Sequence, residues 1–218
     1  MMHSTPRDFT PLIEGLAADL APVTPQQQRR GISYALAAWV VAATALLVML
    51  GVREDLGRDM LVPGALLQIF WSGSLGLVAS WFAVRMAMPG VGRDHGGWRW
   101  AAAVATIVPL AAILSLLAAP AERWPLTQPH AAMDCVWQGL LAGSVVAAAL
   151  TLWLRQGAPS SPERAGLVTG IAAGATGVTI VALHCPVYAL MHVGIWHGLA
   201  IAIAAVVGRI ALPPLLRW

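Results

Sequence analysis

The stretch LVTGIAAGATGVTIVALHCP, residues 167–186, contains no Asp, Glu, Lys or Arg and decides the fold class. A helix needs about 20 mostly apolar residues to cross the hydrocarbon core of a bilayer, and this stretch supplies that length. Gly170, Gly174 and Gly177 follow at steps of four and three, so they share one helical face and permit close helix packing. We expect a transmembrane helix packed tightly within its own chain, with a pore or a dimer face as the alternatives.

The whole chain has the composition of an integral membrane protein. Of its 218 residues, 58% are hydrophobic and 11% are charged, and the mean hydropathy is +0.72. A soluble domain carries roughly 25% charged residues. The formal net charge of +3 is small and dispersed along the chain, which argues against direct nucleic-acid binding.

Six segments, the quoted stretch included, are long and apolar enough to cross a bilayer. They cover residues 32–51, 65–88, 101–119, 136–154, 167–186 and 193–212. The apolar runs are continuous and rich in Ala and Leu, which favours helices over strands. The predicted fold is an all-α integral membrane bundle of six transmembrane helices. Its domain at 32–214 follows an N-terminal arm at 1–31 and precedes a short tail at 215–218.

The arginines predict which way this bundle faces, because the cytoplasmic loops of membrane proteins are enriched in positive charge. With the N-terminus in the cytoplasm, only Arg53, Arg58 and Arg123 of the 13 basic residues lie outside. We therefore expect both termini to lie in the cytoplasm.

The arm contains a predicted helix in the stretch TPLIEGLAADLAPVTP, residues 10–25. Thr10 is the expected N-cap, Pro11 occupies the first helical position, and Pro22 follows the end of the helix. Its apolar residues fall on one face: Phe9, Leu12, Ile13, Leu16 and Leu20. A helix that lies on a membrane surface normally carries basic residues on its polar face, whereas this one carries acidic residues. The pattern favours a protein partner with a basic groove, and packing on the chain's own bundle is the alternative.

Two cysteines and three histidines converge on the outer side of the predicted bundle. Cys135 begins the fourth segment and Cys185 ends the fifth, while His184 and His192 fall on the same side. His197 lies about one turn into the sixth segment. One interpretation is a structural disulfide or two thiols that never meet, and another is a redox switch. The sequence leaves both open.

A third interpretation is a transition-metal site. Cys135, His184, Cys185 and His197 are its predicted ligands, with His192 as a further donor nearby. The spacing matches no standard zinc signature, because His192 and His197 are five residues apart and do not fall squarely on one helical face. No cofactor is otherwise indicated.

The motifs of the common enzyme classes are missing from the sequence. It contains no GxSxG, no HExxH and no P-loop, and no pair of carboxylates lies within the apolar segments. We therefore expect a protein that is not an enzyme. A small transporter or a metal-handling membrane protein that uses the same cysteines and histidines is the alternative function.

An ordered set of short sequences resembles a known family. They are LIEGLAADLAPV in the arm, DC at 134–135, RQGAP at 155–159, LHCP at 183–186, WHG at 196–198 and the final LLRW. Together they are similar to the NrsF-type membrane anti-sigma factors, the negative regulator of sigma F family of six-span proteins in the inner membrane of proteobacteria.

The resemblance implies a regulatory function at the bacterial inner membrane. Members hold an extracytoplasmic-function sigma factor inactive through the cytoplasmic arm, and oxidative or heavy-metal stress sensed outside releases it. The sensing pair implied here is Cys135 and Cys185. The docking segment would include the apolar stripe of the arm, with Leu12, Ile13, Leu16 and Leu20; that assignment rests on their helical spacing.

Overall fold

The computed structural model describes most of the chain, with short gaps. The described residues are 8–18, 20, 26–54, 56–59, 61–88, 97–127, 129–157 and 159–216, without the side chains of 56, 59 and 129–131. Within them every regular element is a helix. The helices are α1 (Thr10–Ala18), α2 (Gln28–Leu50), α3 (Leu56–Asp59), α4 (Pro63–Met86), α5 (Gly97–Ala118), α6 (Pro120–Arg123), η1 (Trp124–Thr127), α7 (Pro129–Arg155), α8 (Pro162–Val181), α9 (Leu190–His192), η2 (Val193–His197), α10 (Gly198–Ala211) and α11 (Pro213–Leu216).

Six of the described helices are long and apolar enough to cross a membrane. They are Gln28–Leu50, Pro63–Met86, Gly97–Ala118, Ala132–Arg155, Pro162–Val181 and Leu190–Ala211, the last being α9, η2 and α10 in succession. The predicted all-α fold with six membrane-length helices is confirmed. The location of the two termini in the cytoplasm stays a prediction.

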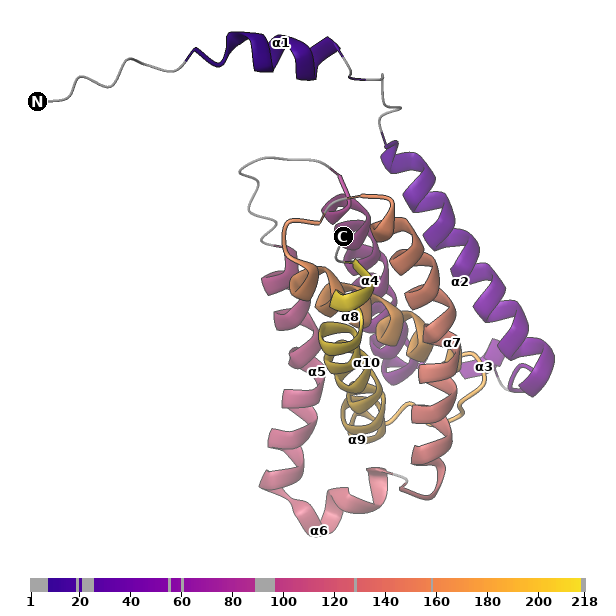
Figure 1. The fold of residues 1–218 in the computed structure, drawn as a ribbon. Helices are drawn as coiled ribbons and strands as arrows, with labels where there is room; N and C mark the ends of the chain where they lie inside the picture. The colour runs from indigo at the N-terminus through magenta and orange to yellow at the C-terminus, as the bar shows by residue number, and fades with distance from the viewer. Residues whose placement is uncertain are drawn as a thin grey trace, which may run out of the picture.

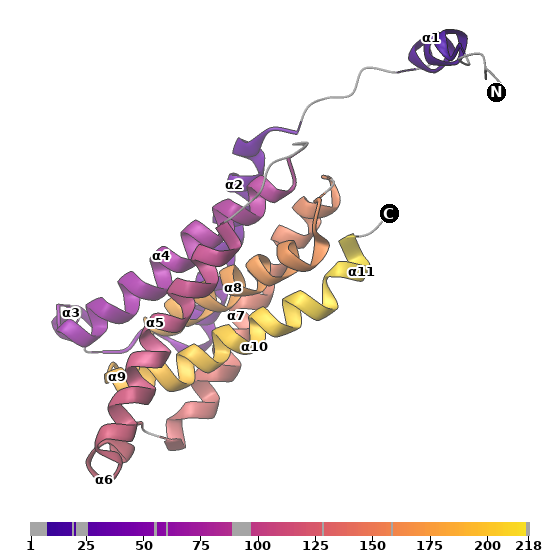
Figure 2. The same ribbon diagram turned by 90° about the vertical axis from the view of Figure 1, so that its left-hand side faces the viewer.

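Figures 1 and 2 show consecutive long helices running in opposite directions. With six such helices, the start of α2 and the end of α11 lie at one end of the bundle. The turn from α8 into α9 lies at the other end, beside the start of α7. The predicted cysteine region and the N-terminal arm therefore belong to opposite ends of the bundle.

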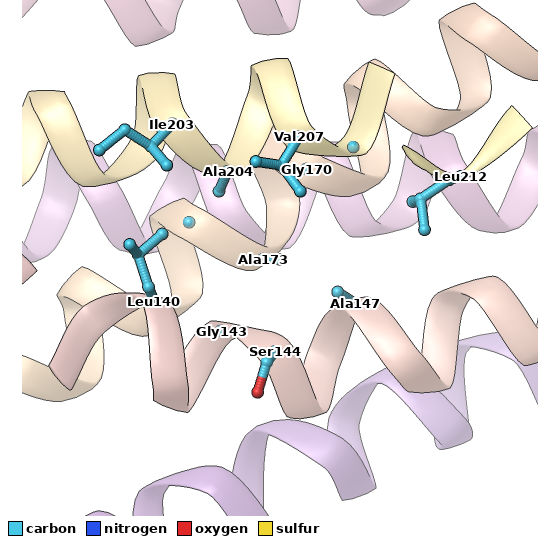
Figure 3. Close-up of a pocket in the computed structure, with 12 residues that line it drawn as sticks. Leu140, Gly143, Ser144, Ala147, Gly170, Ala173, Ile203, Ala204, Val207 and Leu212 are labelled. Atoms are coloured by element: carbon cyan, nitrogen blue, oxygen red, sulfur yellow. The ribbon is translucent and has the colours of Figure 1, made fainter. Parts of the chain in front are cut away.

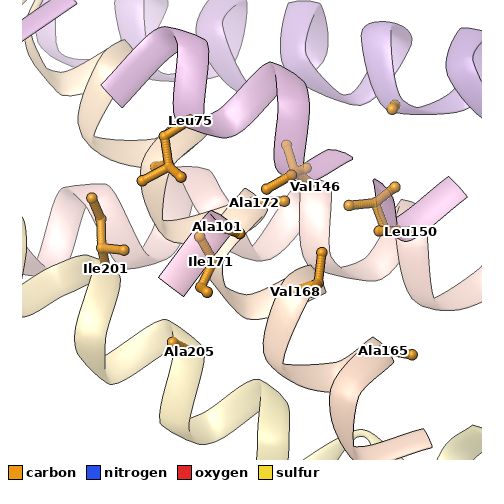
Figure 4. Close-up of a cluster of buried hydrophobic side chains, with 14 of the residues drawn as sticks. Leu75, Ala101, Val146, Leu150, Ala165, Val168, Ile171, Ala172, Ile201 and Ala205 are labelled. Atoms are coloured by element: carbon orange, nitrogen blue, oxygen red, sulfur yellow. The ribbon is translucent and has the colours of Figure 1, made fainter. Parts of the chain in front are cut away.

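Helix α8 is the central helix, and it packs against α7, α10 and α4. Its most apolar 18-residue stretch is 83% buried, whereas the same measure is 22% in α2 and 17% in α5. Figure 4 shows Val168 and Ile171 of α8 among side chains from its neighbours, including Val146 of α7 and Ile201 of α10. The other long helices are thus arranged around α8 and expose more of their apolar surface, as helices that face lipid do.

Glycines set the distance between α8 and its two main partners. A Cβ on Gly170 would overlap the carbonyl oxygen of Ala204 in α10, and one on Gly177 would overlap that of Gly139 in α7. At Gly174 the added atom would lie 2.8 Å from the Cα of a residue in α10. The expected tight packing within the chain is present, and the glycine face serves two helices at once.

A shallow apolar groove of about 280 Å³ runs between α7 and α10 above this glycine face. Figure 3 shows Leu140 and Ala147 of α7 on one side, and Ile203 and Val207 of α10 on the other. The two outer helices contact α8 more closely than they contact each other.

Each long helix begins a few residues before its predicted start, and two differences lie in the cysteine and histidine region. Helix α8 ends at Val181, so the last five residues of the predicted segment 167–186 leave the helix. Pro186 accounts for this, because proline disfavours the helical conformation of the residue before it. The sixth helical segment begins at Leu190, three residues before the predicted start.

Helix α1 contains Leu12, Ile13 and Leu16 of the predicted apolar stripe and is capped differently from the prediction. Thr10 is its first helical residue, and the Asp8 Oδ1 accepts a hydrogen bond of 3.0 Å from the Thr10 N–H. Hydrogen bonds from the Thr10 hydroxyl and N–H hold the pKa of Asp8 below its usual value. Every described residue of α1 is exposed, and Figures 1 and 2 show α1 apart from the bundle.

Replacing Gly170 by alanine tests the glycine packing. We expect Gly170→Ala to lower the thermal unfolding temperature of the protein in detergent, because overpacking against a backbone costs about 1–3 kcal/mol. Gly73→Ala in α4 is the matched control, since its Cβ would lie 3.6 Å from the Thr179 side chain, an ordinary contact. An unchanged unfolding temperature in Gly170→Ala would contradict the packing described above.

Candidate functional site

The site is built where the chain leaves α8 and turns into the last long helix. Residues 182–189 form a turn and an extended segment that places Cys185 against the start of α7. Helix α9 follows, and η2 is a single turn of π-helix, in which the hydrogen bonds span five residues. His192 and His197 are also five residues apart, so the wider turn brings both imidazoles to the same side.

Four buried side chains meet at this point. The Sγ atoms of Cys135 and Cys185 lie 3.3 Å apart, with both thiols free. The Cys185 Sγ is 3.8 Å from the His192 Nε2, and the rings of His192 and His197 meet edge to face with centroids 5.3 Å apart. One sulfur or nitrogen atom from each of the four residues lies within 4.8 Å of the others.

The backbone of η1 fixes the orientation of His192. Its Nδ1 lies 2.9 Å from the Thr127 carbonyl oxygen, which also accepts a hydrogen bond from the Trp196 Nε1. A carbonyl oxygen only accepts hydrogen bonds, so the His192 Nδ1 carries a proton. The other ring nitrogen, Nε2, faces the cysteines.

A glutamine from α4 orients the second imidazole. The Gln68 Nε2 lies 2.8 Å from the His197 Nδ1, and both side chains are buried. The opposite ring nitrogen, Nε2, is also buried and has no hydrogen-bond partner among the described residues. The cluster thus includes a nitrogen that faces the thiols and is not satisfied by the surrounding protein.

His184 lies outside the cluster and instead contacts the end of α2. Its Nδ1 donates a hydrogen bond of 3.1 Å to the carbonyl oxygen of Gly51, the residue that ends α2. The structure therefore brings together Cys135, Cys185 and His197 of the predicted metal set and adds His192 in place of His184. The reason is local: adjacent residues at the end of α8 point in different directions.

Arg53 provides a second connection between α2 and the cysteine segment. The Arg53 Nη1 donates a hydrogen bond of 3.1 Å to the Cys185 carbonyl oxygen. The Arg53 backbone N–H donates one of 3.3 Å to the Leu183 carbonyl oxygen. The guanidinium also lies 5.5 Å from the centre of the Tyr188 ring. The segment that carries Cys185 is thus fastened to the end of α2.

Cys185 has the more acidic environment of the two thiols. The hydrogen bond from the Cys135 S–H lowers the pKa of Cys185, against the effect of burial. A thiolate is the reactive form of cysteine.

The predicted docking residues lie at the other end of the molecule. Leu12, Ile13 and Leu16 belong to α1, while Leu20 lies beyond its last residue. Their side chains are 61–77% exposed. Nothing in the described part of the chain covers them.

Gln68 and Thr127 are functional candidates that the sequence did not indicate. They come from α4 and η1, 129 and 65 residues away from the histidines that they contact. The sequence offered one signal for this role of Gln68, a polar glutamine within an otherwise apolar segment. Its partner depends on how the helices pack.

The fold and the site together define a helical protein with six membrane-length helices, a buried thiol–imidazole cluster at one end and an exposed apolar helix at the other. Comparison with known families gives a more specific class. The family described as negative regulator of sigma F matches residues 16–218, and the chain belongs to this family.

Two relatives match along nearly their whole length. The anti-sigma-F factor NrsF of Caulobacter vibrioides is 32% identical over 214 residues, which cover 95% of this chain and 98% of the relative. The probable anti-sigma-F factor NrsF of Azospira oryzae is 28% identical over 210 residues, 96% and 97% of the two chains. No solved structure matches significantly. The family is regulatory rather than catalytic, consistent with the expectation that the protein is not an enzyme.

The proximity of the two sulfur atoms makes a direct prediction. Mild oxidation of the purified protein is expected to join Cys135 to Cys185 within one chain, because the Sγ atoms already lie 3.3 Å apart. Labelling with a thiol-reactive polymer should then add no mass until a reductant is supplied. Cys135→Ser and Cys185→Ser are the controls and should each keep one free thiol. Two labelled thiols after oxidation would contradict the geometry.

Proposed function

We propose that the protein is a membrane-bound anti-sigma factor whose N-terminal arm holds an extracytoplasmic-function sigma factor inactive at the inner membrane. In this proposal Cys135 and Cys185 face the periplasm, and oxidative or heavy-metal stress acts on them to release the sigma factor. The observation that carries the proposal is the arrangement of an exposed apolar helix and a thiol pair at opposite ends of one bundle, in a chain of the sigma F regulator family.

The arm has the properties of a docking helix. Leu12, Ile13 and Leu16 expose their side chains on α1, and Glu14 adds negative charge. Sigma factors bind DNA through basic surfaces, which an acidic amphipathic helix complements. Attachment to the membrane also raises the local concentration of the arm around any partner held there.

The thiol pair has a chemistry suited to an external signal. The Cys185 thiolate attacks one oxygen of a peroxide, which leaves a sulfenic acid and a molecule of water or alcohol. The Cys135 thiol then displaces the hydroxyl as water and forms the disulfide, so two electrons pass from the thiols to the peroxide. The Sγ distance of 3.3 Å allows this second step with a small movement of residues 182–189.

Helix α2 is the proposed route between the two ends. Gly51 and Arg53, at its far end, hold the cysteine segment through His184 and the Cys185 carbonyl, and its first residue, Gln28, follows the arm helix along the chain. Only 22% of its apolar stretch is buried, so it is held less firmly than α8. A displacement of the cysteine segment therefore shifts α2 and changes how the arm is presented. A differential stabilisation of about 5.5 kcal/mol moves such an equilibrium from 1:99 to 99:1.

Leu16→Asp tests the docking helix in the full chain. We expect at least 100-fold weaker binding of the cognate sigma factor, since a buried leucine contributes about 1.5–3 kcal/mol and a buried unpaired carboxylate adds a penalty. Binding of each sigma factor from the source organism to the protein in nanodiscs is the measurement.

Ala18→Asp is the matched control. It adds the same charge to α1 on the opposite face by helical spacing, and it should leave the affinity almost unchanged. Equal affinities for Leu16→Asp and the unmodified chain would rule out the proposed docking face. Sigma binding by none of the candidates, together with ion movement in vesicles, would favour a transporter instead.

Arg53→Met tests the route through α2. The disulfide should still form in this variant, but oxidation should no longer lower the affinity for the sigma factor, because the contact between Arg53 and the Cys185 carbonyl is lost. Arg58→Met, an exposed arginine in α3, should respond to oxidation like the unmodified chain. A normal response in Arg53→Met would show that the signal takes another path.

A further inference from the structure

The buried cluster has donors that neither thiol oxidation nor sigma-factor docking uses. His192 and His197 are fully buried, and both turn a ring nitrogen toward the two sulfur atoms. The His197 Nε2 is a buried polar atom without a partner among the described residues. Such an atom destabilises the fold unless a ligand satisfies it.

We propose that Cys135, Cys185, His192 and His197 form a four-coordinate site for a divalent cation of the zinc and cadmium class. The site itself rests on the geometry of these four residues. Its use as an input that controls sigma-factor release rests on the proposed function.

The distances fit a tetrahedral ion. Bonds of 2.3 Å to sulfur and 2.0–2.1 Å to nitrogen place the donors of a tetrahedral zinc site roughly 3.3–3.8 Å from one another. The Cys135 and Cys185 Sγ atoms are 3.3 Å apart, and the Cys185 Sγ lies 3.8 Å from the His192 Nε2. The sulfur atoms need to separate by about half an ångström to bind the ion, and donor atoms that lie farther apart, within the 4.8 Å limit of the cluster, need to move closer together.

The charges also match such an ion. Two thiolates and two neutral imidazoles give a complex with a divalent cation that carries no net charge. A neutral complex avoids the large penalty of burying unpaired charge. Thiolate and imidazole donors together select zinc-like ions over magnesium or calcium, which prefer oxygen.

The surroundings of the histidines resemble the outer shell of a metal site. Histidine ligands usually donate their second N–H to a carbonyl or carboxylate, which fixes the ring. His192 already donates to the Thr127 carbonyl oxygen. For His197 the partner is Gln68, whose amide oxygen takes the place of its nitrogen after a half turn of the amide group. The His197 Nδ1 then carries the proton, and Nε2 is free to bind the ion.

Metal binding and disulfide formation exclude each other, because both use the same two thiolates. Hydrogen peroxide takes up two electrons from the metal-bound thiolates and two protons from water. The thiolates become a disulfide, two molecules of water form and the cation is released. A bound ion therefore holds the site in its reduced arrangement. Its loss accompanies oxidation.

Cobalt(II) titration of the reduced, chelator-stripped full chain in detergent is the test. We expect one equivalent to bind per chain, with the visible absorption of tetrahedral cobalt and a thiolate charge-transfer band. Cadmium should displace the cobalt. His192→Ala and His197→Ala should each weaken binding by at least 100-fold and alter the spectrum. Met133→Ala, at an exposed position of α7 next to the cluster in sequence, is the control and should bind like the unmodified chain.

Substitutions of Gln68 separate a positioning role from a loss of folding. Gln68→Leu should weaken cobalt binding by about 10–100-fold, and Gln68→Glu should restore it, because a carboxylate accepts the His197 N–H. Unchanged affinity in His197→Ala, or no cobalt binding by a folded chain whose thiols still form the disulfide, would overturn the metal site. Sigma-factor binding by the stripped protein is measured separately, so failure of the metal site leaves the docking proposal standing.

Discussion

The structure depends on the close approach of two backbones to α8. Gly170 and Gly177 leave no room for a side chain between this helix and its partners α10 and α7, and α8 is the most buried of the long helices. Because α7 begins and α8 ends at the same end of the bundle, their packing determines where Cys135 and Cys185 meet. The geometry of the thiol pair is therefore a consequence of helix packing deep in the bundle.

The last helical segment completes the site through an irregularity in its backbone. The π-helical turn of η2 brings His192 and His197 to one side, and contacts from α4 and η1 hold their rings in place. π-Helical turns are frequent at functional sites, where they orient side chains that a regular helix would separate. The cluster therefore joins α4, η1, α7 and the segments that flank η2.

Much of this organisation follows from the sequence, and the remainder depends on packing. Continuous apolar runs predicted all six helices, and the position of the cysteines at the ends of two of them predicted that they share one end. The predicted ligand His184 instead binds the end of α2, because Pro186 ends α8 early and turns the chain. Gln68 could not be paired with His197 from the sequence, since only the tertiary fold brings them together.

The central claim is that the arm and the thiol cluster lie on opposite sides of the membrane. Single cysteines at Ala18 in α1 and at Ala121 in α6, in a chain with Cys135→Ser and Cys185→Ser, test it directly, because both positions are exposed at opposite ends of the molecule. In cells whose outer membrane alone has been permeabilised, a membrane-impermeant maleimide should reach the periplasm and label position 121. Position 18 should react only after the inner membrane is permeabilised. Labelling of both positions from the same side would contradict transmembrane signalling by this protein.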